Sequence, residues 1–283
     1  MARYNIQNRI VLITGAAHGI GWATAQAFSQ RGATVIMCDV DVQKGYERAN
    51  ELGEHTHFIP LDVRNRDAFI QVVNEIETRW GSLDVLINNA GIMPIGPMQD
   101  LSESTERQLF EINVFGAING IHAVLPNMLH RNAGQIVNIA SLMSHIPTPY
   151  AALYTGTKFA IRGVTEALRH ELRATNVHLC VVYPSLVQTE LVAGIRPLSF
   201  PPAVNPTQVA RAIVQGVERK RLQVYIPKIG RFLGSLPTFL PQFALEKIAK
   251  LTGLTKLFYH IDTADRQSYR HRLKENAEPP TSS

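Results

Sequence analysis

Residues 14–21 of the chain, TGAAHGIG, decide the fold, because they join a short apolar run to a helical pattern. The run before them, RIVLIT at 9–14, is typical of a buried strand, and the helical pattern extends from about residue 20 to residue 31. The glycines of this turn allow a tight bend and a close approach to an anion, which free N–H groups at the start of a helix would bind. The stretch indicates a dinucleotide-binding turn, although its spacing is not the common G-x-G-x-x-G and an ordinary glycine-rich turn is the alternative.

Further apolar runs alternate with helical patterns along the chain, at residues 33–38, 56–61, 84–88, 135–140, 177–183 and 222–226. The helical patterns between them include residues 41–52, 66–80, 103–131 and 152–174. Nearly continuous β-branched runs that are separated by helices are typical of a parallel sheet covered on both faces. We expect an α/β fold with a doubly wound, Rossmann-like, seven-stranded parallel sheet, plus a C-terminal helical extension.

The chain shows no linker before residue 227, and we expect residues 1–227 to form one dinucleotide-binding and catalytic domain. Residues 228–273 are expected to form a helical, amphipathic and basic extension. The polar segment 274–283 is expected to be a disordered tail.

The composition, 45% hydrophobic and 18% charged, is that of a globular protein. Cys38 and Cys180 end apolar runs and are expected to be buried free thiols in a reducing compartment. The ten histidines show no metal-ligand spacing, so no metal site is expected. The net charge of +5 is concentrated in residues 219–274, which hold 12 Lys/Arg and 3 Asp/Glu, and this uneven spread argues against nucleic-acid binding. With no signal segment and no uninterrupted apolar run of spanning length, the chain is expected to be cytoplasmic.

Asp39 ends the second apolar run, 18 residues after Gly21. A carboxylate there can accept hydrogen bonds from an adenosine ribose diol and would repel a 2′-phosphate. The turn residues Ala16, Ala17 and His18 bring no arginine or lysine, and none follows Asp39 directly. We therefore expect NAD rather than NADP as the cofactor. The alternative is that Asp39 caps the helix expected at 41–52.

Other motifs follow the glycine turn in a fixed order: Asp62-Val63 after the third run, NNAG at 88–91 after the fourth, and Tyr-x3-Lys at 154–158 after the fifth. With TG-x3-GIG at 14–21, they make the chain similar to the short-chain dehydrogenase/reductase family over roughly residues 8–227. The resemblance implies a nicotinamide-dependent oxidoreductase acting on CH–OH groups. The cofactor-binding residues that it implies are Gly15, Ala17, His18, Gly19, Ile20, Gly21, Asp39, Asp62, Val63, Asn89, Ala90, Gly91, Tyr154, Lys158, Pro184, Val187 and Thr189.

The resemblance also implies a catalytic tetrad of Asn113, Ser141, Tyr154 and Lys158. Tyr154 would exchange a proton with the substrate oxygen while hydride passes between the substrate and the nicotinamide. Lys158 would hold the nicotinamide ribose, Ser141 would hydrogen-bond to the substrate oxygen, and Asn113 would hold a water that connects Lys158 to solvent. Ser144 is the alternative to Ser141, but it stands 10 rather than 13 residues before Tyr154.

Two tyrosines precede Lys158 at intervals of four, which would place Tyr150, Tyr154 and Lys158 on one face of a helix. Tyr150 lies close behind Pro147 and Pro149, where the helix is not expected to have begun. Tyr154 is therefore the predicted acid/base, and Tyr150 a packing or cleft-wall residue. A tyrosine has an ordinary pKa of about 10, and we expect a nearby ammonium and the oxidised nicotinamide to favour the phenolate.

The loops expected to face the cleft are apolar: IMPIGP at 92–97, LMSHIP at 142–147 and LVQTELVAGIRPLSF at 186–200. They predict a lipophilic substrate, such as a steroid, retinoid, terpenoid or long-chain alcohol. The alternative is that these side chains pack against the chain's own C-terminal segment. Ser185 replaces the glycine that usually follows the family's proline, here Pro184, and His145 is expected at the surface of its loop rather than on the substrate. The substrate-lining candidates are Met93, Met143, His145, Tyr150, Ser185 and Leu191.

Together these features predict an NAD(H)-dependent enzyme that interconverts a secondary alcohol and a ketone on a hydrophobic molecule. One alternative is an NADPH-dependent 3-oxoacyl thioester reductase, against which Asp39 argues. Another is a non-catalytic dinucleotide-binding scaffold, a class that typically lacks the tyrosine or the lysine. The long helices expected at 103–131 and 152–174 resemble those that pair across twofold axes in the family, so a homodimer or homotetramer is expected.

Residues 228–261 carry apolar side chains with lysines and arginines between them. Pro237 and Pro241 divide the segment into short helices that cannot span a bilayer. We expect it to fold over the substrate cleft of its own or a neighbouring subunit. The competing prediction is peripheral contact with an anionic membrane surface, with basic side chains on the lipid phosphates.

Overall fold

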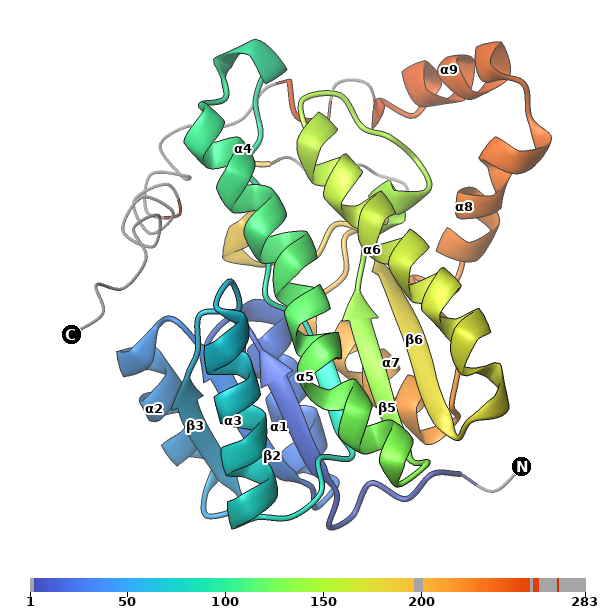
Figure 1. Ribbon diagram of the computed structural model, residues 1–283. Coiled ribbons are helices and arrows are strands. Elements are labelled where there is room, and N and C mark those ends of the chain that lie inside the picture. The colour runs from blue at the N-terminus through green and yellow to red at the C-terminus, as the bar shows by residue number, and fades with distance from the viewer. Residues whose placement is uncertain (1–2, 196–200, 255–256, 260–268, 270–283) are drawn as a thin grey trace.

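The computed structural model describes residues 3–195, 201–254, 257–259 and 269, and its centre is a seven-stranded parallel sheet in the order β3-β2-β1-β4-β5-β6-β7 (Figure 1). The doubly wound, seven-stranded sheet predicted from the apolar runs is confirmed, and no strand end differs from its prediction by more than one residue. The strands are β1 (Ile10–Thr14), β2 (Thr34–Asp39), β3 (Thr56–Pro60), β4 (Val85–Asn88), β5 (Gly134–Ile139), β6 (Val177–Pro184) and β7 (Gln223–Ile226).

Helices cover both faces of this sheet, because its strands are apolar on both sides. Val11 and Ile13 of β1 belong to one buried cluster, and Ile10 and Leu12 to another on the opposite face. The helices that follow the strands are α1 (Gly19–Ser29), α2 (Val42–Leu52), α3 (Arg66–Arg79), α4 (Glu103–Phe110), α5 (Gly116–His130), α6 (Ala152–Glu171) and α7 (Pro206–Glu218). In Figure 1, α3, α5 and α6 lie in front of the sheet, while α1 and α7 lie behind it.

The helix expected at 103–131 is not uniform. Its range is correct, but α4 and α5 are joined by a π-helical turn, Glu111–Phe115, that contains Asn113. A π turn widens the helix locally and is frequent at functional sites, and no periodicity in the sequence announces it. The combined stretch Glu103–His130 is the one described helix that is long and apolar enough to span a membrane. Within it, an 18-residue window has a mean hydropathy of 1.3, and 44% of this window is buried in the protein.

The strand order reverses between β1 and β4, where chain segments leave the sheet in opposite directions. In open parallel sheets, ligands bind at the carboxyl ends of the strands beside such a switch point. Here Asn89, which follows β4, donates its side-chain N–H to the carbonyls of Thr14 and Gly15 at 2.9 and 3.0 Å. This contact fixes the glycine turn after β1 against the end of β4.

The predicted C-terminal extension begins with two helices, α8 (Gly230–Phe239) and α9 (Gln242–Leu251). Figure 1 shows them beyond the carboxyl ends of the strands, at the end of the molecule where α6 begins. The tail expected at 274–283 lies outside the described residues, as does most of 260–273.

Candidate active site

The glycine turn has the backbone shape that its sequence predicted. Gly15 and Gly19 have φ angles of 64° and 51°, in the left-handed region that side chains disfavour. At Gly21 an added Cβ would lie 2.0 Å from the Gly15 carbonyl oxygen, so only glycine allows this close packing of turn and helix. The turn therefore brings the first residues of α1 directly beneath the end of the sheet.

The N-terminus of α1 has free N–H groups that can bind an anion. Its N-cap, His18, makes no side-chain cap hydrogen bond, and the first turn of the helix holds no acidic residue. Gly15, His18, Gly19 and Ile20 line a cleft of about 2070 Å³ that runs across the ends of the strands. Uncapped N–H groups and the helix dipole at this point fit the pyrophosphate of a dinucleotide. Ala17 and Gly21 do not line the cleft and instead shape the turn.

Asp39 lies at the far end of the same cleft, where β2 ends. Its two carboxylate oxygens accept hydrogen bonds from the N–H groups of Ala17, at 2.9 Å, and Asp41, at 3.1 Å. Each oxygen keeps capacity for a further donor such as a ribose hydroxyl. Burial raises the pKa of Asp39, and these two hydrogen bonds oppose the increase. Asp39 does not cap α2, because that position belongs to Asp41, which accepts from the N–H of Lys44.

Two arginines that the sequence motifs did not indicate line this end of the cleft, Arg48 from α2 and Arg64 from the loop after β3. Arg64 is bound to Asp62, with its Nη2 donating to the carboxylate at 2.6 Å. Arg48 stacks on the ring of Trp22 at 4.6 Å. It also donates to Glu51 at 2.9 Å. Both arginines are thus engaged by the protein's own groups.

Val63, Asn89, Ala90 and Gly91 line the middle of the cleft. An added Cβ on Gly91 would lie 3.2 Å from the Asn113 Oδ1 and 3.7 Å from the Lys158 Nζ. Gly91 therefore leaves room between the predicted catalytic asparagine and lysine.

Asn113 is buried in the π turn and does not itself line the cleft. Its Oδ1 accepts the N–H of Ile92 at 2.8 Å, and its Nδ2 donates to the Ile92 carbonyl at 2.9 Å and to Thr157 at 3.2 Å. These contacts join α4 and α5 to the segment after β4 and to α6. Asn113 thereby holds together the elements that carry Lys158 and Gly91.

The two candidate serines differ in orientation. Ser141 lines the cleft and caps the short 3-10 turn η3 (Leu142–Ser144), accepting the N–H of Met143 at 3.2 Å. Ser144 is fully buried and donates to the Ser141 carbonyl at 2.6 Å. The geometry therefore presents Ser141, and not Ser144, to a bound molecule.

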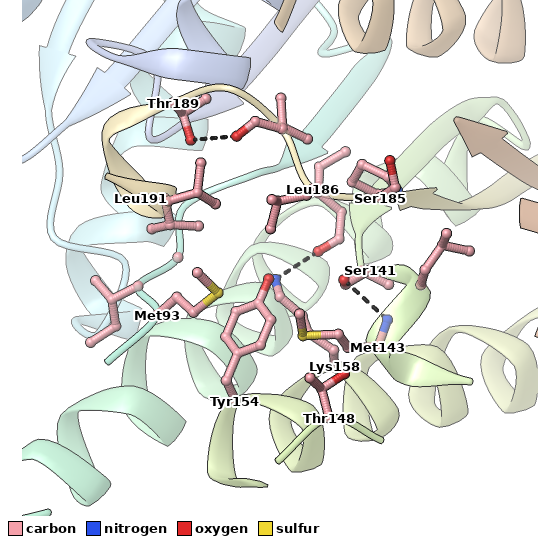
Figure 2. A pocket seen from close by; sticks show the side chains of 18 of the residues that line it. Met93, Ser141, Met143, Thr148, Tyr154, Lys158, Ser185, Leu186, Thr189 and Leu191 are labelled. Atoms are coloured by element: carbon pink, nitrogen blue, oxygen red, sulfur yellow. Dashed lines mark hydrogen bonds between the residues drawn. The ribbon is translucent and has the colours of Figure 1, made fainter. Parts of the chain in front are cut away.

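Tyr154 and Lys158 lie on the cleft side of α6 (Figure 2). The Lys158 Nζ donates to the Ile139 carbonyl at 2.9 Å and lies 5.5 Å from the centroid of the Tyr154 ring. Burial lowers the pKa of Lys158 to about 8. Burial also raises the pKa of Tyr154, and a hydrogen bond from Ser141 only partly opposes this increase. The expectation of a favoured phenolate is thus not met by the protein groups alone, because burial raises the pKa of Tyr154 more than the Ser141 hydrogen bond lowers it.

Tyr150 packs against the apolar cluster beside Tyr154 and is not among the cleft-lining residues, so of its two predicted roles, packing and cleft wall, the geometry favours packing. It precedes α6 with a positive φ of 65°, and its ring packs edge-on against Tyr259 at 5.6 Å. Because α6 begins only at Ala152, Tyr154 lies in its first turn and faces the cleft, as do Lys158 and Phe159 of the same helix.

Pro184, Ser185, Val187 and Thr189 line the cleft after β6. Thr189 approaches the glycine turn, since an added Cβ on Gly19 would lie 3.1 Å from its methyl group. Ser185 donates its hydroxyl to the Pro202 carbonyl at 3.3 Å. The serine that replaces the family's glycine is therefore held by a neighbouring loop.

The wall beside Tyr154 is apolar. Figure 2 shows the Tyr154 ring between the side chains of Met93 and Met143, with Leu186 and Leu191 further along the same wall. These side chains form one cluster with buried residues of the C-terminal segment, Leu257 and Phe258 among them. The two interpretations of the apolar loops therefore both apply: they face the cleft and they pack against the C-terminal segment.

Tyr269 also belongs to this wall and was missed by the sequence motifs. It is buried, lines the cleft, and accepts the N–H of Met93 on its hydroxyl at 2.7 Å. Its charge state influences Tyr154, whose pKa it helps to raise. Nothing in the local sequence around residue 269 indicates this contact, because it joins residues 176 positions apart.

His145 lines the cleft but is buried, which corrects its expected place at the surface. Its Nδ1 accepts from Arg162 at 2.9 Å, and its Nε2 faces the Tyr225 hydroxyl at 3.4 Å. Burial and the Arg162 charge lower the pKa of His145 to about 4, so the ring is neutral at physiological pH. It acts as a packing and hydrogen-bonding residue beneath α8.

Comparison with known proteins assigns the chain to a family whose members carry out the chemistry that this site suggests. Residues 9–198 match the family described as short chain dehydrogenase. The chain is 28% identical to 17-beta-hydroxysteroid dehydrogenase 13 of Rattus norvegicus over 258 residues, which cover 89% of this chain and 86% of that protein. It is 33% identical to cyclopentanol dehydrogenase of Comamonas sp. (strain NCIMB 9872) over 212 residues, covering 73% and 85%. The closed form of serine dehydrogenase complexed with NADP+ has a TM-score of 0.67 at 30% identity, covering 72% of this chain and 87% of that one.

The fold and the site define an oxidoreductase that uses a nicotinamide dinucleotide and acts on CH–OH groups. The chain belongs to the short-chain dehydrogenase family, as the glycine turn and the Tyr-x3-Lys pair predicted.

Proposed function

We propose that this enzyme interconverts a secondary alcohol and a ketone on a lipophilic molecule, with NAD(H) as the cofactor. The observation that carries the proposal is the apolar wall of Met93, Met143 and Leu191 directly beside Tyr154 and Ser141. A wall of this kind binds hydrocarbon skeletons, while the two hydroxyls bind the single oxygen that reacts.

The nicotinamide, when bound, accepts or donates the hydride. The protein's own residues hold and move the proton. Ser141 orients the substrate oxygen, and Tyr154 takes its proton in oxidation or gives one in reduction. Lys158 holds the ribose of the cofactor and, as an ammonium next to Tyr154, lowers the cost of the phenolate. Asn113 fixes the position of Lys158 relative to the segment of Gly91, because its side chain hydrogen-bonds to both Ile92 and Thr157.

The preference for NAD over NADP is supported by two carboxylates at the ribose end of the cleft, Asp39 and Asp41. Asp41 also pairs with His18 at 2.7 Å, which adds bulk where a 2′-phosphate would approach. Arg48 is the residue that could favour NADP, but its guanidinium is stacked on Trp22 and bound to Glu51. Isothermal titration should give NAD a dissociation constant at least about tenfold lower than NADP. Replacement of Asp39 by alanine together with Val40→Arg should reverse this order, and tighter NADP binding by the unmodified protein would contradict the proposal.

The lipophilic substrate is supported by relatives named for a 17-beta-hydroxysteroid and for cyclopentanol, both cyclic alcohols. The test is a spectrophotometric assay of NAD+ reduction with a hydroxysteroid, a long-chain secondary alcohol, cyclopentanol and serine. We expect kcat/KM to rise with the apolar area of the substrate, because each buried methylene contributes about 0.8 kcal/mol. Activity on serine alone would contradict the proposal.

We also propose that the enzyme is a cytoplasmic homodimer or homotetramer. Phe115, at the π turn, and Phe159, on α6, are exposed apolar side chains on the two long helices that the family pairs across twofold axes. Light scattering should give a mass of at least twice 31.5 kDa at micromolar concentration. A mass equal to that of a single chain would contradict it.

A further inference from the structure

Helix α8 lies directly on the loop that carries Ser141. Its residues Gly230 and Gly234 face this loop, where an added Cβ would lie 2.9 Å from Leu142 and 3.1 Å from His145. Glycine at both positions lets the helix backbone approach the loop closely. The C-terminal helices are therefore attached to the catalytic region itself and not to a remote surface.

A second face of the same helices lines the cleft. Leu233, Leu236 and Leu240 of α8 recur at intervals of three and four, and all three line it together with Leu245 and Ala249 of α9. The inner side of α8 and α9 thus adds to the apolar wall near Tyr154. This arrangement supports the lid function expected for the segment.

The third face is exposed and strongly apolar. The side chains of Phe232, Phe239, Phe243 and Leu251 are 61%, 78%, 74% and 79% exposed. Phe232 and Phe239 are seven residues apart on α8, and Phe243 and Leu251 eight apart on α9, so each pair lies on one side of its helix. Such a group of exposed phenyl and aliphatic side chains marks a surface that binds another apolar phase.

Basic side chains accompany this face and indicate the partner. Lys228, Arg231, Lys247 and Lys250 are exposed. Lys250 and Glu246, the acidic residue of α9, also line the cleft and so lie at the edge between the inner and outer faces of the helix. None of these four basic residues forms an ion pair within the part of the chain that the structure describes. A second copy of this face would bring like charges together, whereas an anionic lipid surface offers both phosphates for the lysines and an acyl layer for the phenyl rings.

We propose that the outer face of α8 and α9, which carries Phe232, Phe239, Phe243 and Leu251, docks on an anionic membrane surface. The cleft beneath these two helices would then open next to the lipid. The lid and the membrane contact, which are alternatives when only the sequence is considered, are then two faces of the same helices. A lipophilic alcohol or ketone dissolved in the membrane would enter along the inner leucines without crossing water. The choice of substrate in this inference rests on the proposed function, but the docking itself does not.

The test is co-sedimentation of the full-length protein with vesicles of phosphatidylcholine, with and without phosphatidylglycerol. The unmodified protein should bind the anionic vesicles and dissociate as salt is raised. Phe239→Ser with Phe243→Ser should lower the partition coefficient at least about tenfold, and Lys247→Ala with Lys250→Ala about fivefold for each lysine. The matched control, Ile70→Ser with Leu222→Ser, removes exposed apolar side chains elsewhere and should leave binding unchanged.

Equal loss in the control variant, or protein that stays in the supernatant at low salt, would overturn the docking. A change in the sedimentation coefficient of the lipid-free Phe239→Ser/Phe243→Ser variant would also overturn it, because the face would then be a contact between subunits. The double variant should keep its kcat/KM on cyclopentanol in solution. If the protein binds vesicles but reduces no NAD+ with any of the alcohols, the docking proposal holds and the proposed function is refuted. The two proposals can therefore fail separately.

Discussion

Replacing Lys158 by methionine should make the folded protein more stable at neutral pH while removing its activity. Lys158 is 5% exposed, and burial lowers its pKa to about 8 from the ordinary value of 10.5. A difference of this size corresponds to about 3 kcal/mol of unfavourable free energy when the folded chain must hold the charge. Methionine has a similar length and no charge, but it leaves the Ile139 carbonyl without its donor, which costs about 1 kcal/mol. The net gain in the free energy of unfolding at pH 7 is about 2 kcal/mol.

The gain in the free energy of unfolding from Lys158→Met should decrease as the pH rises. Below about pH 8 the lysine is protonated in both the folded and the unfolded chain, so the folded protein carries the full cost of burying the charge. Between pH 8 and 10.5 the folded chain has released the proton and the unfolded chain has not, so the stability of the unmodified protein rises with pH. Near pH 10 most of the cost has gone, and what remains is similar in size to the lost hydrogen bond, so the variant and the unmodified protein should then be about equally stable.

Urea denaturation of both proteins at pH 7, 8, 9 and 10 would measure the change, with Lys44→Met as a control because Lys44 is partly exposed and paired with Glu47. The control should differ from the unmodified protein by less than about 0.5 kcal/mol at every pH. Added NAD should stabilise the unmodified protein more than Lys158→Met, since the variant lacks the cation that we propose to hold the ribose of the cofactor. A variant that is less stable than the unmodified protein throughout this pH range would refute the reasoning.

Tyr154→Phe should lower kcat at least about a hundredfold, because it removes the exchangeable proton. Tyr150→Phe should lower kcat less than about threefold in the same assay. The opposite order would show that the wrong tyrosine was assigned. Gly21→Ala should weaken NAD binding and lower the free energy of unfolding by about 2 kcal/mol or more, because its Cβ would lie 2.0 Å from a carbonyl oxygen of the glycine turn. Gly163→Ala, where nothing lies within 4 Å of the added Cβ, is the helix control and should be neutral or stabilising in calorimetry. Tyr269→Phe should raise KM for the lipophilic substrate several-fold with kcat within about twofold, since a buried N–H loses its acceptor and the apolar wall shifts; an unchanged KM would count against its place in the wall.

Several features could be predicted from the sequence because they depend on neighbouring residues. A buried strand needs only a short apolar run, and this is why all seven strands were placed within a few residues of their ends. The preference for Tyr154 over Tyr150 is equally local, since prolines delay the start of α6 until Ala152 and leave Tyr150 in a positive-φ turn. The shape of the glycine turn also follows from residue type alone, because only glycine adopts its angles freely.

Other features were decided by packing between distant segments. Arg48 and Arg64 line the same cleft as Asp39 because α2 and the loop after β3 converge there, although neither arginine is adjacent to Asp39 in the sequence. His145 is buried because α8 returns to cover its loop through Gly234. Tyr269 meets Met93 across 176 residues. The sequence by itself determined the order of elements, the glycine turn and the Tyr154–Lys158 pair, since each depends on spacings within a helical turn or a strand. Only the tertiary structure decided which charges, rings and helices surround them, because those contacts depend on how separate elements pack in three dimensions.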